Sequence, residues 1–364
     1  FLDRYRDRIG HIQIAAVPSR AEPDEGTLDY RPVFEQIEAI LDRLTTLRVL
    51  VLGDVILDEY RLGDVDRVSP EAPVPIVRVR ETIRALGGAG NVARGVAALG
   101  ARATLVGVVG DDAEGEAVRA LLAQAGLSTG GLVVAAERPT THKLRVVARA
   151  QQMLRLDREE QVAFDAATRD ALRERIAECL PVVDVVVLQD YDKGVFVDGL
   201  ARFVLEAARA HRLPVMVDPK RDLGRFRGAS LLKPNVDEAL ANVAGGVDDF
   251  AARRALLEKL AHVLGGAEVV LTRGRAGVSA LDASGRAFDV PTTPREVYDV
   301  QGAGDTAIAA LALCRAAGAS LVDACIVANA AAGLAVAKSG TAVVSATELR
   351  PAIAAARAAF EGAS

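Results

Sequence analysis

Short apolar runs alternate with longer amphipathic segments along most of the chain, starting near residue 48. Each run is apolar at successive positions and ends in a polar or glycine-containing turn: RVLVLGD (48–54), ATLVGVVGD (103–111), DVVVLQD (184–190), PVMVDPK (214–220), SLLKPN (230–235) and EVVLTRG (268–274). Strands that are buried on both faces and separated by helices form a mostly parallel sheet covered by helices. The pattern therefore predicts a doubly wound α/β fold.

Two stretches interrupt this alternation. Residues 60–85 and 131–157 alternate apolar and polar positions without an intervening helix, and the first contains three prolines within six residues. Proline on an edge strand prevents the addition of another strand. We expect both stretches to supply the strands of a small antiparallel flap, or lid, that projects from the main sheet; an irregular surface loop is the alternative.

Residues 1–45 follow a different pattern. They predict one strand, GHIQIAAV (10–17), a long polar loop, and a helix, VFEQIEAILDRL (33–44). This single βα unit precedes the first strand of the main domain. We therefore expect an appended segment at 1–45 and one large domain at 46–364.

Composition narrows the class of protein. A chain of 364 residues that is 51% apolar can bury a large core, and no apolar run approaches the length of about 20 residues that spans a bilayer. The net charge of −5, without a basic block, argues against a nucleic-acid surface. The cysteines Cys179, Cys314 and Cys325 lie far apart, which predicts neither a zinc site nor a disulfide framework and suits a reducing cytoplasm.

The segment DVQGAGDT (299–306) precedes an Ala- and Leu-rich helix. The turn Gly302-Ala303-Gly304 would direct free backbone N–H groups and the positive end of the helix dipole at one point, which favours an anion. Asp305, in the first helical turn, would then take a proton from a hydroxyl that attacks a phosphoryl group. An ordinary helix N-cap by Asp305 is the alternative, although an N-cap needs no preceding glycine.

Two other phosphate-binding motifs fit this chain less well. Gly302, Gly304 and Ala307 match the dinucleotide-binding spacing, but the upstream segment is polar and a second helix follows where that motif requires a strand. A Walker A motif is excluded because the chain contains no Gly-Lys dipeptide.

Further candidates follow from the position of polar residues at strand ends, because ligands bind at the carboxyl ends of the strands in open α/β sheets. These residues are Asp54, Asp111, Asp190, Asp218, Lys220, Asn235 and Thr272. The glycine-rich segment 86–100 places Asn91 in a first helical turn, where it would bind sugar hydroxyls, unless the glycines only form a tight helix entry. Asn235 and Glu238 lie three residues apart, and their oxygen atoms suit a hydrated Mg²⁺.

Taken together, the motifs resemble the ribokinase-like (PfkB) sugar kinases, in the order of that family and over residues 48 to 350. They are GDVILDEY, GGAGNVARGVAALG, DPK, KPNVDE, LTRGRAG, DVQGAGDT and ANAAAGLAVAKSGT. The resemblance implies a three-layer α/β/α sandwich with a mostly parallel central sheet and a small β-lid. It also implies a cytoplasmic enzyme that uses ATP and Mg²⁺, acts on a small-molecule substrate, and forms a homodimer without nucleic-acid or membrane partners.

The same resemblance assigns roles to individual residues. Asp305 matches the catalytic base, and Gly302, Ala303 and Gly304 match the anion hole. The nucleotide and metal side is matched by Asn235, Glu238, Lys220, Thr272, Gly274 and Asn329, with Glu238 reaching Mg²⁺ through water. The sugar side is matched by Asp54, Asp58, Gly88, Asn91, Lys143, Arg145, Gln152, Asp190 and Lys193, where Lys143 and Arg145 alternate along one strand and so face the same side.

Within the family, DRVSPEAPVPIV, PTTHKLRVVARAQQMLRLD and DYDKG are similar to kinases that phosphorylate the C1 hydroxyl of D-glycero-β-D-manno-heptose 7-phosphate in ADP-heptose and lipopolysaccharide synthesis. A PfkB kinase for ribose, fructose or a ketogluconate, and a catalytically silent binding regulator, are the alternatives. Bifunctional relatives append a nucleotidyltransferase with a His-x-Gly-His signature; nothing similar follows residue 350, so we expect the kinase step alone.

Two features depart from the family pattern. Gln301 stands where related kinases usually have Thr or a similar small residue, and we expect its side chain to point away from the turn, so that activity survives. Residues 10–30 resemble the C-terminal part of hydroxypyruvate isomerase-like TIM barrels, in which Gln13 would lie among metal ligands. One βα unit cannot close a barrel, so we expect His11 and Gln13 to have no catalytic role.

Overall fold

The computed structural model describes residues 39–149, 151–160, 164–292, 300–338 and 342–363. Within this range the chain begins with a helical segment at residues 39–44. The strand predicted at 10–17, with His11 and Gln13, lies outside the described residues.

The main sheet has the strand order β13-β12-β11-β10-β9-β8-β1-β4-β5 among the described residues. All pairs from β11 to β5 are parallel, and only β12 and β13 run antiparallel to their neighbours. The strands are β1 (Arg48–Gly53), β4 (Arg102–Gly110), β5 (Leu132–Ala135), β8 (Val185–Gln189), β9 (Val215–Asp218), β10 (Leu231–Leu232), β11 (Glu268–Thr272), β12 (Val278–Leu281) and β13 (Ala287–Val290). The predicted mostly parallel sheet is therefore confirmed.

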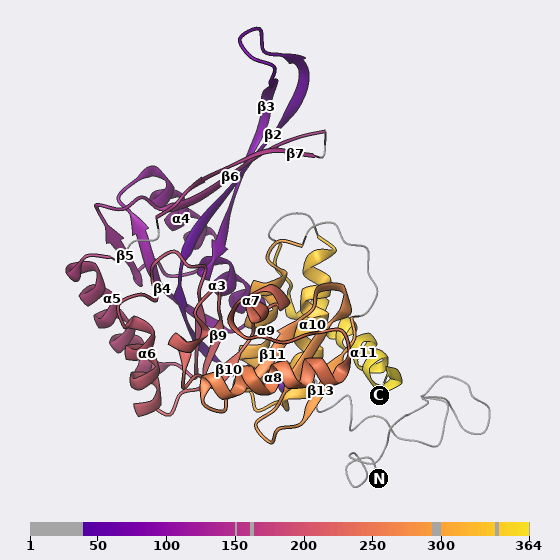
Figure 1. Ribbon diagram of the computed structural model, residues 1–364. Coiled ribbons are helices and arrows are strands. Elements are labelled where there is room, and N and C mark those ends of the chain that lie inside the picture. The colour runs from indigo at the N-terminus through magenta and orange to yellow at the C-terminus, as the bar shows by residue number, and fades with distance from the viewer. Residues whose placement is uncertain (1–38, 150, 161–163, 293–299, 339–341, 364) are drawn as a thin grey trace.

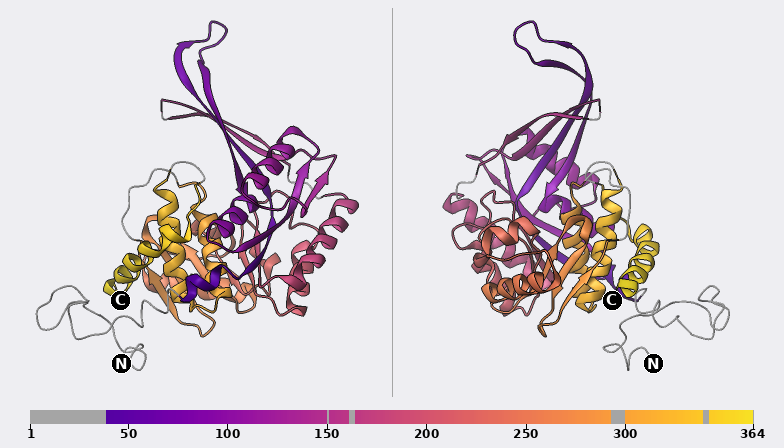
Figure 2. Two further views of the ribbon diagram at one scale, coloured as in Figure 1. Left: turned by 180° about the vertical axis from the view of Figure 1, so that it is seen from behind. Right: turned by 45° about the vertical axis from the view of Figure 1, so that its right-hand side comes forward.

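Helices cover both faces of this sheet (Figures 1 and 2). One buried cluster contains residues of α3 (Ala89–Ala98), α4 (Ala113–Gln124), α9 (Ala303–Ala316), α10 (Leu321–Val336) and α11 (Ala346–Ala363). The other contains residues of α5 (Ala166–Cys179), α6 (Leu200–Ala210), α7 (Val236–Asn242) and α8 (Phe250–Leu264). Successive residues of β1 enter opposite clusters: Val49 and Val51 join the first, Leu50 and Leu52 the second. This alternation explains why the run is apolar at every position, and it gives the predicted three layers.

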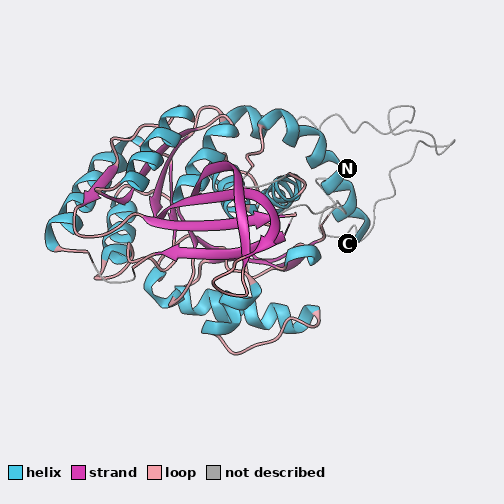
Figure 3. Cartoon of the chain, turned by 90° about the horizontal axis from the view of Figure 1, so that it is seen from above, coloured by secondary structure: helices cyan, strands magenta, loops and turns pink. Residues whose placement is uncertain are grey.

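A second sheet forms the lid, which projects from the body of the molecule (Figures 1 and 2) and overlies the main sheet when viewed from above (Figure 3). It consists of β3 (Pro75–Gly88), β2 (Val55–Val68), β6 (Thr141–Ala148) and β7 (Gln151–Arg158), in that order. The lid differs from the expected antiparallel flap because β2 and β6 pair in parallel. The chain passes through β3, α3, β4, α4 and β5 between these two strands, and this long connection permits the parallel pairing. Strand β5, which lies within the stretch predicted for the lid, instead joins the edge of the main sheet.

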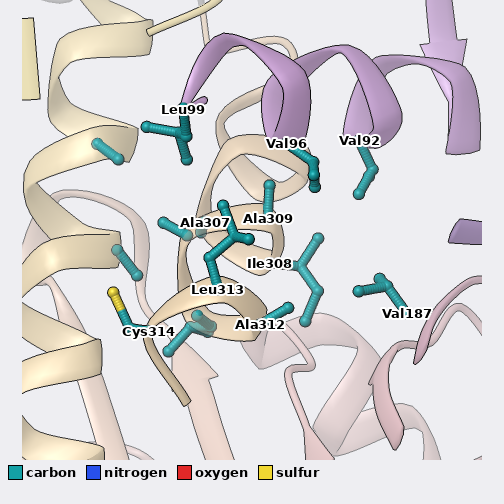
Figure 4. Close-up of a cluster of buried hydrophobic side chains, with 14 of the residues drawn as sticks. Val92, Val96, Leu99, Val187, Ala307, Ile308, Ala309, Ala312, Leu313 and Cys314 are labelled. Carbon is teal, nitrogen blue, oxygen red and sulfur yellow. The ribbon is translucent and has the colours of Figure 1, made fainter. Parts of the chain in front are cut away.

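Helix α9 packs on the main sheet beside α3 and α10 through small and aliphatic side chains (Figure 4). An added Cβ at Gly95 of α3 would lie only 3.6 Å from the Cβ of Ala309, so the two helices approach closely. The contact comprises Val92, Val96, Leu99, Val187, Ala307, Ile308, Ala309, Ala312, Leu313 and Cys314. Dense packing of this kind fixes the N-terminus of α9 against the strand ends.

Candidate active site

The predicted glycine turn lies at the start of α9, but the Ala303 N–H is not free, because it donates to the Val300 carbonyl at 3.5 Å. Gly302 is the N-cap residue and has a φ of 76°, a left-handed conformation that favours glycine. Its carbonyl oxygen accepts hydrogen bonds from the Thr306 backbone N–H at 2.9 Å and from the Thr306 hydroxyl at 3.0 Å. Ala303 and Gly304 follow as the first helical residues, with Gly304 exposed and Asp305 next to it 4% exposed.

Three side chains from separate segments fix the carboxylate of Asp305. Asn91 Nδ2 donates to Oδ2 at 2.7 Å, and both the Tyr191 hydroxyl, at 2.9 Å, and Gln189 Nε2, at 3.1 Å, donate to Oδ1. Asn91 is oriented in turn by Arg94, whose Nη2 donates to Asn91 Oδ1 at 2.8 Å. The Asp305 side chain therefore joins a network of side-chain donors and does not act as an N-cap.

Burial raises the pKa of Asp305, and the hydrogen bonds from Asn91 and Tyr191 and the charge of Lys233 offset part of this increase. A carboxylate with a raised pKa is a stronger base than an exposed one. It is therefore better suited to take a proton from an alcohol.

A buried ion pair lies beside Asp305. Lys233 Nζ is 2.9 Å from Asp218 Oδ1, and Gln189 Nε2 donates to Asp218 Oδ2 at 3.2 Å as well as to Asp305. Burial raises the pKa of Asp218 to about 6, although Lys233 lowers it. Three strand ends, those of β8, β9 and β10, thus place Gln189, Asp218 and Lys233 around the N-terminus of α9.

Asp54 holds a loop in place. The residue is buried, with an exposed fraction of 2%. Its carboxylate accepts hydrogen bonds from the backbone N–H groups of Tyr191 at 2.7 Å, Lys193 at 3.0 Å and Val195 at 3.3 Å. The bonds position Tyr191 and Lys193, both of which belong to the DYDKG segment. Gly88, the N-cap residue of α3, also lies at this point, with a φ of 55°.

The lid presents cations and aromatic rings to the strand ends. Arg145 Nη1 lies 2.6 Å from Asp58 Oδ1, and both residues are buried. Arg145 also stacks over the ring of Tyr60, with 5.2 Å from Cζ to the ring centroid, while Lys143 Nζ lies 5.5 Å from the centroid of Tyr191. In the register of β2 and β6, Lys143 lies opposite Asp58 and Arg145 lies opposite Tyr60. Lys143 and Arg145 therefore occupy alternate positions of β6 and face the same side of the lid, as expected.

Burial lowers the pKa of Lys143, and the nearby Lys193 contributes to this decrease, whereas Asp58 opposes it. Lys193 Nζ bonds to Glu159 Oε1 at 2.8 Å. Gln152 is exposed on β7, opposite Val147 of β6.

Gln301 connects the lid to the turn that opens α9. Its Oε1 atom accepts a hydrogen bond from the hydroxyl of Tyr60 on β2. The side chain therefore extends from the turn towards the lid.

The residues predicted for the nucleotide lie at the neighbouring strand ends. Asn235 and Glu238 form a reciprocal capping box at the start of α7, and Lys220 Nζ lies 3.0 Å from Glu238 Oε1. Thr272, at the end of β11, forms a parallel bridge with Asn235. Further along, Asn329 Nδ2 donates to the Pro291 carbonyl at 2.8 Å, and the hydroxyl of Thr292 lies 3.5 Å from both Asn329 Oδ1 and the Gly274 carbonyl.

The side-chain oxygen atoms of Asn235 and Glu238 fit a magnesium ion that keeps most of its waters better than an ion coordinated by protein ligands alone. Among the described residues, no group of three or more His, Cys, Asp or Glu side chains is arranged to hold a metal. Glu238 adds negative charge near Asp218, since it contributes to the raised pKa of that residue. Mg²⁺ commonly keeps several waters and binds through one or two carboxylates and substrate phosphates, which agrees with such a sparse set.

Asp190 gives a testable pH dependence. The residue is 4% exposed, its Oδ2 has no hydrogen-bond partner among the described residues, and burial together with the charge of Asp54 raises its pKa to about 7. The ordinary pKa of this carboxyl, which applies in the unfolded chain, is 3.8. Between pH 3.8 and about pH 7 the folded protein therefore binds more protons than the unfolded chain. The free energy of unfolding falls as the pH rises through this range. One pKa unit corresponds to about 1.4 kcal/mol.

We therefore expect Asp190→Asn to be more stable than the wild type at pH 8, by roughly 2 to 4 kcal/mol, with the difference shrinking towards pH 5. Urea denaturation at several pH values measures this. Asp170→Asn, an exposed partner of Arg173 on α5, is the control and should follow the wild type. Parallel curves for the wild type and Asp190→Asn would contradict the assignment.

The structure adds residues that the sequence analysis did not assign: Gln189, Tyr191, Lys233, Tyr60 and Arg94. The first three lie in the strand-end motifs LQD, DYDKG and KPN, so their position at the sheet edge was available from the sequence. Their contacts with Asp305 and Asp218 depend on the folded geometry. Asp111, predicted among the strand-end candidates, is exposed.

Comparisons with known proteins indicate the family of the chain. The family model described as pfkB family carbohydrate kinase matches residues 47–348. The D-beta-D-heptose 7-phosphate kinase of Bordetella bronchiseptica is 46% identical over 310 residues, which cover 85% of this chain and 96% of that one. The bifunctional protein HldE of Caulobacter sp. (strain K31) is 49% identical over 311 residues, and the match covers 83% of this chain but only 62% of that longer one.

Solved structures support the fold. Phosphofructokinase-2 from Escherichia coli, in complex with potassium, has a TM-score of 0.71 at 24% identity, and the match covers 86% of this chain and 99% of that chain. Arabidopsis thaliana ribokinase complexed with ribose and ATP has a TM-score of 0.67 at 18% identity, with 85% and 99% covered. In the described part of the chain, no helix has the length and apolar character needed to cross a membrane. The family model and the relatives together show that the chain belongs to the pfkB family of carbohydrate kinases.

Proposed function

We propose that this protein is an ATP-dependent kinase that phosphorylates the C1 hydroxyl of D-glycero-β-D-manno-heptose 7-phosphate to give the 1,7-bisphosphate. The observation that carries the proposal is the carboxylate of Asp305, fixed by Asn91, Gln189 and Tyr191 beside the glycine turn that opens α9. The substrate class is supported by the relatives, one of which is named D-beta-D-heptose 7-phosphate kinase.

In this mechanism Asp305 takes the proton of the sugar C1 hydroxyl while the oxygen of that hydroxyl attacks the γ-phosphorus of ATP. The new O–P bond forms while the bond from the γ-phosphorus to the bridging oxygen of ADP breaks. The backbone N–H groups of Gly302 and Gly304 and the helix dipole of α9 stabilise the negative charge on the group in transfer. Closure of the lid excludes water, which protects ATP from hydrolysis.

The sugar phosphate lies between the strand ends and the lid. Asn91 bonds sugar hydroxyls at the start of α3, next to the tight turn at Gly88. Lys143, Arg145 and Lys193 supply positive charge for the 7-phosphate, and Gln152 is placed further out on β7. Asp58 orients Arg145, and Asp54 holds the loop that carries Lys193 and Asp190.

ATP occupies the neighbouring strand ends, where Thr272, Gly274 and Asn329 bind the nucleoside and Lys220 and Asn235 lie towards the phosphates. Glu238 would hold Mg²⁺ through water, and the ion would neutralise charge on the phosphates. A cytoplasmic homodimer that acts in ADP-heptose synthesis for lipopolysaccharide completes the proposal, with residues 46–364 as the kinase domain and 1–45 as an appended segment.

A panel of acceptors tests the proposed function. The protein is incubated with ATP and Mg²⁺ and with heptose 7-phosphate, unphosphorylated heptose, ribose, fructose or ketogluconate, and ADP release is followed by a coupled assay. We expect the highest kcat/KM with heptose 7-phosphate, because the ammonium group of Lys143, next to Arg145 on the lid, would bind its phosphate. A higher value for an unphosphorylated sugar would contradict the proposed substrate, and ATP binding without turnover on any acceptor would favour a silent regulator.

A further inference from the structure

Lys233 is a buried cation at the point where phosphoryl transfer is proposed. It follows β10, is 3% exposed, and its Nζ atom lies 2.9 Å from Asp218 Oδ1. A Cβ atom added at Gly304 would lie 3.6 Å from Lys233 Nζ and 3.8 Å from Asp218 Oδ2. The ammonium group is therefore adjacent to the second residue of α9, within the glycine turn assigned to the anion.

The place is electrostatically unusual for a lysine. The N-terminus of a helix carries partial positive charge, which favours anions and disfavours a neighbouring ammonium group. A buried charge also loses hydration, so it requires compensation from a partner. Asp218 and the nearby Asp305 provide negative charge on one side, while the turn on the other side concentrates positive charge.

Gln189 ties the two carboxylates together. Its Nε2 atom donates to Asp218 Oδ2 at 3.2 Å and to Asp305 Oδ1 at 3.1 Å. The base and the ammonium group are thus held in one arrangement, with the glycine turn beside both. The ammonium group therefore lies between the two carboxylates and the glycine turn, close to the point where an anionic group bound at the turn would lie.

We propose that Lys233 is a further catalytic residue, whose ammonium group contacts a non-bridging oxygen of the phosphoryl group during transfer. Asp218 and Gln189 are positioning residues, since they act through Lys233 and Asp305. The inference rests on the proposed function, because it assumes that a phosphoryl group passes between ATP and a sugar at this turn. It differs from a purely structural ion pair, which would stabilise the fold without binding the transferred group.

The test uses Lys233→Met in the full chain, because Met keeps most of the length of the stem and removes the charge. We expect kcat to fall about 10²-fold, the size typical for loss of one preorganised donor to a transition state. Binding of Mg-ADP alone, measured by calorimetry, should change less than about twofold. Binding of ADP with aluminium fluoride and heptose 7-phosphate, which mimics the group in transfer, should weaken by about the same 10²-fold.

Two further variants separate catalysis from folding. Lys233→Met combined with Asp218→Asn removes both charges and leaves no unpaired buried ion; it should fold and show the same loss of kcat and of aluminium fluoride binding. Lys233→Arg keeps the charge and should recover part of both. Lys259→Met, which replaces an exposed lysine on α8, is the matched control and should behave as the wild type.

The outcomes are distinguishable. If the wild type phosphorylates the sugar while the double variant keeps kcat and the aluminium fluoride complex within about threefold, Lys233 has only a structural role and this inference is overturned. If the wild type itself phosphorylates no acceptor of the panel, the proposed function fails.

Discussion

Replacing Asp305 with Asn is expected to lower kcat roughly 10³-fold, because a positioned general base contributes about 10² to 10⁴ in rate. The amide cannot accept the proton of the sugar hydroxyl, yet it has nearly the same shape as the carboxylate. ATP binding should change little, since the carboxylate lies on the sugar side of the proposed transfer. Single-turnover kinetics and nucleotide calorimetry measure the two effects separately.

Asp323→Asn is a matched control for this substitution. Asp323 also lies in the first turn of a helix, α10, where its Oδ2 accepts a hydrogen bond from the Ser320 hydroxyl at 2.7 Å. A change in the charge of a helix terminus alone would therefore affect both variants. Activity of Asp305→Asn comparable to that of Asp323→Asn would exclude Asp305 as the base.

Asp54→Ala is expected to lower the free energy of unfolding by about 3 to 5 kcal/mol, because it leaves three backbone N–H groups without their acceptor, and a buried unsatisfied donor costs about 1 to 3 kcal/mol. Those donors belong to Tyr191, Lys193 and Val195. The loss of their acceptor releases the segment that carries Tyr191, so kcat should also fall. Urea denaturation and steady-state kinetics on the same sample test both effects.

Asp170→Ala provides the reference for this stability measurement. Asp170 is exposed and pairs with Arg173 one helical turn away, an interaction worth at most about 1 kcal/mol. We expect a change near zero for this variant. A similarly small change for Asp54→Ala would mean that the 190–195 segment is held by other contacts.

Much of the fold was predictable because the apolar runs are specific. Residues 49–52 within RVLVLGD are apolar at every position, and only a sheet covered on both faces buries Val49 and Leu50 at the same time. The turn Gly302-Ala303-Gly304 was predictable for another reason: a helix capped by Asp305 would need no glycine before it. Asp305, which directly follows that turn, was therefore placed correctly at the start of a helix.

Other features depend on contacts between distant residues, which a pattern of apolar positions does not encode. Asp54 looks like any strand-end carboxylate in the sequence, and its three N–H donors lie more than 130 residues away along the chain. The parallel pairing of β2 with β6 depends on how the chain returns after β5. Lys233 precedes a motif that was noted for Asn235 and Glu238, and its importance becomes visible only when Asp218 and Gly304 lie beside it.

The hydrogen bond between Tyr60 and Gln301 makes the residue at one of these positions depend on the residue at the other. Tyr60 lies on a strand of the lid, and Gln301 directly precedes the glycine turn, 241 residues later. A relative with Thr at the position of Gln301 has a side chain too short to reach the same hydroxyl. The two positions should therefore covary across the family, with Tyr retained at the first chiefly where a long acceptor side chain occupies the second.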